Sequence, residues 1–189
     1  MKKIFYILTI LLFKINIAYS LIEVDITRGN LDPLPVAVSP LHVDPKSDNY
    51  QDVKTKELGD LISSVVEKNF RSTGLFNPLN KDAFVQKPDI AHLKPRFEDW
   101  SLITAQALVT GKILIKDEKL KIEFRLWDVA ANKEMIALAF TTTPSNWRRV
   151  AHIISDKIYE RLTGETGYFD TRIIYVSETG PKTQRVKKL

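Results

Sequence analysis

The sequence contains no cysteine and only seven glycines in 189 residues. The missing thiols exclude a disulfide framework, a cysteine-ligated zinc site and thiol catalysis. The few glycines leave little material for phosphate-binding loops, and no Gly-x-Gly-x-x-Gly, Walker or Gly-x-Ser-x-Gly motif occurs. These absences argue against a nucleotide-dependent enzyme or a serine hydrolase.

Metal ligands are also scarce. His42, His92 and His152 are widely separated, and no His-x-x-x-His pair is present. This spacing favours ordinary surface or half-buried histidines over a zinc site. Residues 44–52 include three aspartates, but a proline and a lysine interrupt them and no glycine stands at the turn that a calcium loop requires. We therefore predict neither a metal nor a cofactor.

Positive charge is in small excess once the first 20 residues are set aside. The whole chain has a net charge of +5. Lys2, Lys3 and Lys14 supply three of these charges, and no acid precedes residue 21, so about +2 remains for the rest. A value this small does not indicate a nucleic-acid-binding protein.

No apolar run is long enough to cross a membrane. The uncharged stretch near the start covers residues 4–13, whereas a spanning helix needs about 20 residues. Lys2 and Lys3 precede it, and Ala18 and Ser20 place small residues at the −3 and −1 positions of a cleavage site. We predict a secretory signal peptide over residues 1–20, cleaved after Ser20, and export to the periplasm. A buried N-terminal helix is the alternative.

Two short strands are predicted after the signal peptide. Residues 21–27 alternate apolar and polar side chains, the pattern of a strand with one apolar face. Leu34–Val38 is a second apolar segment, in which Pro35 indicates either the start of a strand or an edge strand. A polar loop follows over residues 39–51.

Two longer segments show helical periodicity. Apolar residues recur every three or four positions over residues 52–72, which predicts an amphipathic helix that ends at Gly74. The same spacing predicts a helix over residues 147–162, capped by Ser145 or Asn146 and ended by Gly164. Between them we expect a short return to the sheet at residues 75–79, a loop over residues 80–96 and a short helix at Phe97–Leu102.

Three consecutive strands are predicted over residues 107–115, 120–129 and 134–142. A charged connection at residues 116–119 and a turn at residues 130–133 separate them. The middle strand alternates apolar and charged residues, which indicates an antiparallel meander with one wet face. A further strand is predicted over residues 168–177, with a hairpin-like stretch behind it. The predicted fold class is α/β, with a small mixed or antiparallel sheet and two main helices packed on it.

Five stretches of the sequence carry motifs of one known family. The most specific are YERLTG with FDTRIIY at residues 159–164 and 169–175, then RSTGLFNPL at residues 71–79. The others are residues 21–29, LPVAVSP at residues 34–40, and residues 107–111 leading into the meander. Together they span nearly the whole chain, which resembles the N-terminal part of the TolB proteins, the periplasmic component of the Tol–Pal envelope system.

The resemblance implies a small α/β domain followed by a six-bladed β-propeller. We expect a signal peptide over residues 1–20, a partner-binding strand over residues 21–33, the α/β domain over residues 34–164, and the start of a truncated first blade over residues 165–189. Since a blade needs four strands, the propeller is expected to be essentially absent.

In the family, the propeller binds Pal and the mature N-terminus binds TolA. Carried over to this chain, the TolA-binding residues are Leu21, Ile22, Glu23, Val24, Asp25, Ile26, Thr27 and Arg28. An alternating strand at a free terminus suits addition to the edge of another sheet, although it also suits an ordinary edge strand of its own domain. Pal binding is expected to be missing without the propeller, and no enzyme activity is expected.

Two alternatives stay open. One is a periplasmic carbohydrate- or peptidoglycan-binding domain or hydrolase that uses Trp100, Trp127 and Trp147 with the acidic loops, although the neighbouring acids 98–99 and 117–118 do not form a glycosidase pair. The other is a folded but inactive remnant of a split gene.

Overall fold

The computed structural model describes residues 32–172, 176–181 and 183–188. The predicted signal peptide and the predicted strand at residues 21–27 lie outside these ranges. Among the described residues, no helix has the length and apolar character needed to cross a bilayer.

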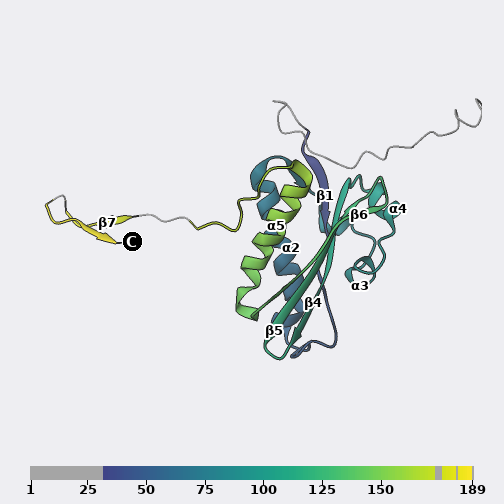
Figure 1. Cartoon of the computed structure of the whole chain (residues 1–189), viewed down its shortest axis with the longest axis horizontal. Coiled ribbons are helices and arrows are strands. Elements are labelled where there is room, and N and C mark those ends of the chain that lie inside the picture. The colour runs from purple at the N-terminus through teal and green to yellow at the C-terminus, as the bar shows by residue number, and fades with distance from the viewer. Residues whose placement is uncertain (1–31, 173–175, 182, 189) are drawn as a thin grey trace, which may run out of the picture.

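A mixed sheet forms the centre of the fold (Figure 1). Its strands lie in the order β3 (Phe76–Pro78), β1 (Leu34–Val38), β4 (Ala107–Lys116), β5 (Lys119–Asp128) and β6 (Lys133–Thr142), and β2 (His42–Val43) also pairs with β4. β1 runs parallel to β3 and β4. β4, β5 and β6 form the predicted antiparallel meander. A charged turn joins the first two of these strands, with Asp117 and Glu118 both at positive φ, 49° and 58°.

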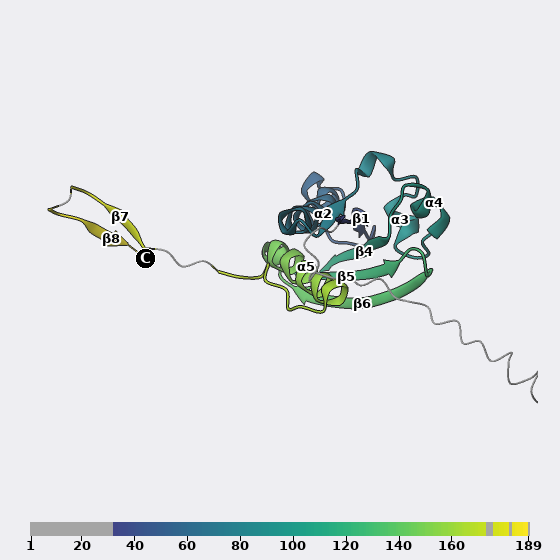
Figure 2. The same cartoon turned by 90° about the horizontal axis from the view of Figure 1, so that it is seen from above.

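Two long helices, α2 (Val53–Thr73) and α5 (Trp147–Thr163), cover one face of the sheet (Figure 2). Both begin and end within a residue or two of their predicted bounds, and Gly74 and Gly164 end them in the left-handed conformation. Their apolar stripes and the facing strand residues form the main core, which includes Ile62, Phe70, Val109, Phe124 and Ile158. The predicted fold class is confirmed: a mixed sheet with two main helices on it.

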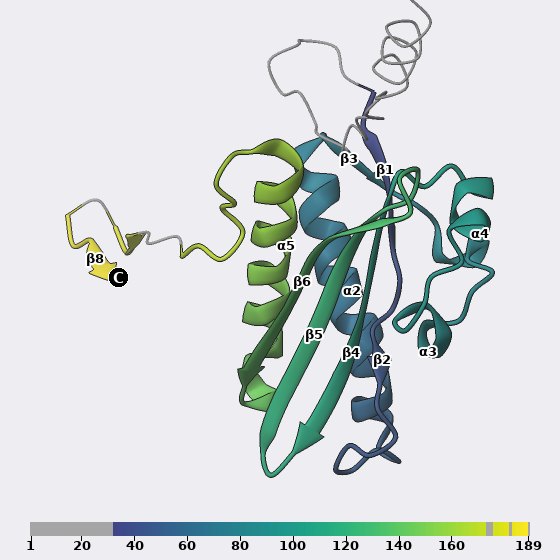
Figure 3. The same cartoon turned by 45° about the vertical axis from the view of Figure 1, so that its right-hand side comes forward.

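The opposite face is covered only in part. The short helices α3 (Pro88–Ala91) and α4 (Phe97–Leu102) lie on this side (Figure 3), whereas the one-turn helix η1 (Lys81–Ala83) contacts α2, with the Lys81 ammonium 2.8 Å from the Ser63 hydroxyl. Together, α3 and α4 bury a second, smaller core that includes Ala37, Leu108, Ala91, Trp100 and Val129. The first two of these belong to β1 and β4, so the covering layer lies over one half of the sheet and leaves the outer sides of β5 and β6 open.

Two local predictions need correction in the first half of the chain. Of the two interpretations of Pro35, the start of a strand is right and the edge strand is wrong, because Pro35 is the second residue of β1 and β1 pairs on both sides. The Pro35 carbonyl accepts from the Gln106 backbone N–H at 3.0 Å. Residues 80–96 are not a plain loop, since η1 and α3 lie within them. Asn80 caps η1 by accepting from the Asp82 backbone N–H, and Pro88 opens α3.

Two further corrections concern the second half. Asn146 is the N-cap residue of α5, but its side chain makes no cap hydrogen bond, since the one-turn helix η2 (Pro144–Asn146) leads directly into α5. Residues 168–172 are not a strand. The carboxylate of Asp156 accepts from the backbone N–H groups of Phe169 and Asp170, which holds this segment against α5. Extended pairing starts only at β7 (Ser177–Thr179), in a hairpin with β8 (Val186–Lys188).

Candidate protein-interaction surface

The strand β6 has a free edge. It is the last strand in the sheet order, and among the described residues only β5 pairs with it. Its ten residues would extend about 33 Å at the usual rise of a strand. The middle of the strand, Met135 to Phe140, carries no charge. Unpaired backbone groups along an uncharged strand are a template for another strand, so this edge is suited to protein binding.

The two sides of β6 differ. On the open side of the sheet, Ala137 and Ala139 lie opposite Arg125 and Glu123 of β5. On the helix side, Leu138 is 40% exposed although its register partner Phe124 is buried. A hollow of about 380 Å³ lies there, lined by Ile136 and by Lys157, Glu160 and Arg161 of α5. A strand added to β6 would therefore meet small and charged residues on one side, and Leu138 beside charged residues of α5 on the other.

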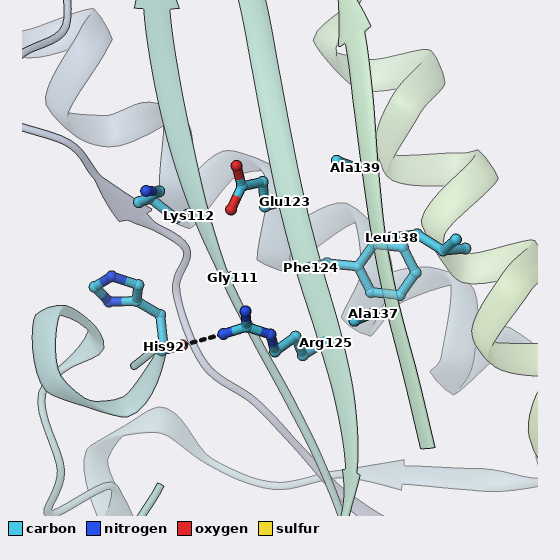
Figure 4. Close-up of a pocket in the computed structure, with 9 residues that line it drawn as sticks. All are labelled: His92, Gly111, Lys112, Glu123, Phe124, Arg125, Ala137, Leu138 and Ala139. Atoms are coloured by element: carbon cyan, nitrogen blue, oxygen red, sulfur yellow. Dashed lines mark hydrogen bonds between the residues drawn. The ribbon is translucent and has the colours of Figure 1, made fainter. Parts of the chain in front are cut away.

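Charged side chains gather on the open side of the sheet (Figure 4). They line a hollow of about 210 Å³, to which Lys112, Glu123, Arg125 and His92 contribute. Arg125 donates to the His92 carbonyl at 3.0 Å and pairs with Glu134 at 3.1 Å. These groups are half-exposed, and such pairs contribute only about 0–1 kcal/mol each to stability. They are better suited to setting the charge of a contact surface than to holding the fold.

Glu123 is held in its charged form. Lys121 lies 2.6 Å from its carboxylate, and the hydrogen bond from this lysine lowers the pKa of Glu123 below its ordinary value. A carboxylate kept ionised in this way does not serve as a general acid near neutral pH. Among the described residues, no group of three His, Asp or Glu side chains is placed to hold a metal ion.

His42 and His92 stack face to face beside this surface, with ring centroids 4.7 Å apart and planes at 12°. Burial lowers the pKa of His42, and the neighbouring His92 lowers it further. His42 lies in β2 and His92 is the C-cap of α3, so the pair joins the covering segment to the sheet. Their separation of fifty positions left no local pattern from which the stack could be predicted.

The three tryptophans do not form a common platform in the described part of the chain. Trp100 is 1% exposed and donates its indole N–H to Gln86. Trp127 is half-buried and donates to the Thr110 hydroxyl at 2.9 Å, while Trp147 is half-buried beneath the Arg148 guanidinium. A sugar-binding surface needs exposed ring faces side by side. The carbohydrate alternative therefore lacks the tryptophan surface on which it depended.

The residues predicted to bind TolA, Leu21 to Arg28, lie outside the described residues. Their role as a strand and as a binding segment stays a prediction. The described chain begins at Asp32 and reaches the sheet at Leu34, the first residue of β1.

Comparison with known proteins decides the family. Residues 22–135 match the TolB amino-terminal domain, which is more than half of the chain. The chain belongs to the TolB family. It is 72% identical over 174 residues to the Tol-Pal system protein TolB of Pelagibacter ubique (strain HTCC1062), covering 91% of this chain and 39% of that relative.

A solved structure supports the TolB fold. The chain is similar to the crystal structure of TolB from Acinetobacter baumannii with a TM-score of 0.61 and 24% identity, covering 77% of this chain and 32% of that one. The chain thus spans well under half the length of the TolB relatives it matches. Its described residues include no four-stranded propeller blade, only the two-stranded hairpin of β7 and β8.

Proposed function

We propose that this TolB-family chain is a non-enzymatic, periplasmic component of the Tol–Pal system that binds TolA through residues 21–28. In that role it supports the integrity of the cell envelope and cell division. The observation that carries the proposal is the 72% identity to a protein named as a Tol-Pal system TolB, over a match that includes these residues within 91% of the chain.

The architecture of the domain supports a binding role for the N-terminal segment. Among the described residues, the core clusters begin at Leu34, the first residue of β1. A segment at a chain terminus can pair with a partner at little cost to the stability of the domain. The alternation of Ile22, Val24 and Ile26 with Glu23 and Asp25 is suited to strand addition at a partner's sheet edge.

Pal binding involves a different part of the TolB proteins. In the family it belongs to the propeller, and the chain spans 39% of the length of its Pelagibacter relative. The hairpin of β7 and β8 has two strands of three residues, whereas a propeller blade needs four. We therefore expect residues 21–189 to bind TolA and not Pal.

The test is calorimetric titration of residues 21–189 with the periplasmic C-terminal domain of TolA. Two altered chains are titrated beside it. One lacks residues 21–30, and the other carries Ile22→Asn, Val24→Asn and Ile26→Asn, which removes the apolar face of the segment and keeps its length and charge. We expect the intact chain to bind and both altered chains to bind at least about tenfold more weakly, which corresponds to about 1.4 kcal/mol.

A matched control is Glu57→Ala, an exposed position on α2. It should bind TolA like the intact chain. Equal binding by the chain that lacks residues 21–30 would place the TolA contact elsewhere in the domain and contradict the proposal.

A further inference from the structure

We propose that the free edge of β6 binds a second copy of this chain, whose own β6 adds to it as an antiparallel strand about a two-fold axis at Leu138. In this arrangement Ile136 of each copy lies opposite Phe140 of the other, and Ala137 lies opposite Ala139. The pairing is independent of the proposed TolA binding, which uses residues 21–28.

The edge of β6 lacks the features that usually prevent strands from pairing. Among the described residues only β5 pairs with it, and its sequence from Met135 to Phe140 has neither a charge nor a proline. Natural sheet edges are commonly protected by charges, prolines or covering segments. A β-bulge at Met135 interrupts the pairing with β5, so the regular part of the edge begins at Ile136. Two-fold symmetry then ends the paired stretch at Phe140.

Charges on the open side of the sheet select the register. Arg125 of β5 lies opposite Ala137, and Glu123 lies two residues earlier, opposite Ala139 (Figure 4). With the axis at Leu138, the Arg125 of each copy falls in one cross-strand row with the Glu123 of the other. An axis at Ala137 would align the two arginines, and an axis at Ala139 the two glutamates. Since like charges across strands are unfavourable, the axis at Leu138 is the best of the three.

These two charged groups already have partners within one copy. The Arg125 guanidinium lies 3.1 Å from Glu134 and donates to the His92 carbonyl, and Lys121 lies 2.6 Å from Glu123. Even so, the Arg125 and Glu123 side chains are 41% and 36% exposed. Only two alanines stand between them in the proposed row, which spans three strand spacings, about 14 Å. Charges arranged in this way contribute more to the choice of register than to affinity.

The helix side of the edge supplies the apolar contact. Leu138 is 40% exposed and meets Leu138 of the second copy at the axis. Ile136 and Phe140, both half-buried, lie opposite one another on either side of it. The hollow beside Ile136 is also lined by Lys157, Glu160 and Arg161. The first two of these pair with each other at 2.8 Å, so the apolar residues have a charged rim, as protein interfaces usually do.

The proposed interface is small, and the association is therefore weak. Five paired residues extend about 17 Å along the strand. A stable interface buries about 800 Å² on each partner, more than a contact along one short edge provides. We expect an equilibrium between monomer and dimer that depends on protein concentration, and not a permanent dimer.

Cysteine trapping tests the register, because the chain has no cysteine of its own. Leu138→Cys places two thiols at the axis, where opposite Cα atoms lie about 4.5–5.5 Å apart, within the range of a disulfide. The matched control is Thr142→Cys, which the register places about 26 Å from its counterpart. We expect residues 21–189 with Leu138→Cys to form a covalent dimer under mild oxidation at least about tenfold faster than the control.

Charge reversal tests the choice of partner, with dimerisation measured by sedimentation equilibrium. Arg125→Glu and Glu123→Arg each align like charges in both rows, and each should weaken dimerisation about fivefold. The double variant realigns opposite charges without changing the net charge and should recover dimerisation, as should an equimolar mixture of the two single variants. Lys68→Glu, at an exposed position on α2, changes the net charge as Arg125→Glu does and should have no effect.

Four outcomes would overturn the pairing. One is a monomer at every concentration up to about 1 mM. The second is trapping at Thr142 as fast as at Leu138. The third is equal weakening by Lys68→Glu, or no recovery in the double variant although urea unfolding shows it to be folded. The fourth is loss of dimerisation in a chain that lacks residues 21–30, which would assign the contact to that segment. None of these outcomes bears on TolA binding, which calorimetry measures separately.

Discussion

Gln86 holds together the segment that covers the open half of the sheet. Its side-chain oxygen accepts from the Arg96 backbone N–H at 2.9 Å and from the Trp100 indole at 3.1 Å, and its amide donates to the Lys94 carbonyl. Gln86 is 4% exposed and Trp100 is 1% exposed, so the Gln86 amide and the Trp100 indole N–H would otherwise be buried without a partner. This single side chain explains why a polar stretch predicted as a loop folds down onto the sheet.

The stacked pair of His42 and His92 predicts how stability responds to pH. Burial, then His92 and Lys112, lower the pKa of His42 below its ordinary value of 6.5, and Asp89 and Asp44 offset part of this shift. Below pH 6.5, His42 binds a proton more readily in the unfolded chain than in the folded chain. The free energy of unfolding should therefore be highest above 6.5 and fall as the pH drops from 6.5 through the folded-state pKa.

Replacing the histidine tests this account. We expect His42→Gln to flatten the fall in the free energy of unfolding between about pH 7.5 and pH 5, measured by urea unfolding at each pH. Other titrating groups contribute the slope that remains in the variant. A variant with the same pH slope as the parent chain would show that His42 does not contribute to the acid sensitivity.

Among the secondary-structure elements, α2 is fixed by a close backbone approach. A Cβ atom added at Gly59 would lie 1.9 Å from the Leu41 carbonyl oxygen, and the Leu41 N–H donates to the Gly59 carbonyl at 3.3 Å. The helix therefore rests directly on the chain between β1 and β2. Glycine in a helix normally lowers stability by about 1 kcal/mol relative to alanine, so its presence here reflects this contact.

The contact reverses the usual effect of a glycine-to-alanine change. We expect Gly59→Ala to lower the free energy of unfolding by about 1–3 kcal/mol, because the helix must move away from Leu41. Glu57→Ala, at an exposed position two residues earlier, should stay within about 0.5 kcal/mol of the parent chain. Both are measured by urea unfolding, and a stabilised Gly59→Ala chain would show that the approach is not tight.

The elements that could be predicted from the sequence are those with a local signal. Apolar periodicity placed α2 and α5, and strict alternation placed β5 and its meander. The pairing of β1 with β3 and β4 could not be read in this way, because parallel partners are joined through long connections and carry no turn signal. The strand predicted over residues 168–177 was wrong for residues 168–172, since hydrogen bonds from the backbone of Phe169 and Asp170 to Asp156 hold this stretch against α5.

At the scale of the whole molecule, the described residues form a sheet with one closed face, one half-covered face and a long free edge at β6. The helices α2 and α5 close the first face, and α3 and α4 cover half of the second. The open edge at β6 lies beside the uncovered half. This asymmetry leaves room for protein contacts without disturbing either core.

The candidate surface was less accessible to sequence analysis than the fold. The binding segment at residues 21–28 was predicted from its alternation and from the family resemblance. The free edge of β6 was not, because β6 resembles any strand of a meander until the sheet order shows that nothing described pairs with its far side. Likewise, the contact between Arg125 and the His92 carbonyl could not be predicted, because it joins positions 33 residues apart.

The central claim is that this chain recognises its partner through a terminal segment and not through the folded domain. The most direct measurement is an NMR titration of isotopically labelled residues 21–189 with the periplasmic C-terminal domain of TolA. We predict that the signals of residues 21–30 change most and that the amides of α2 and β3 stay unchanged. Changes centred on the hollow around Lys112 and Arg125, with residues 21–30 unaffected, would contradict the account.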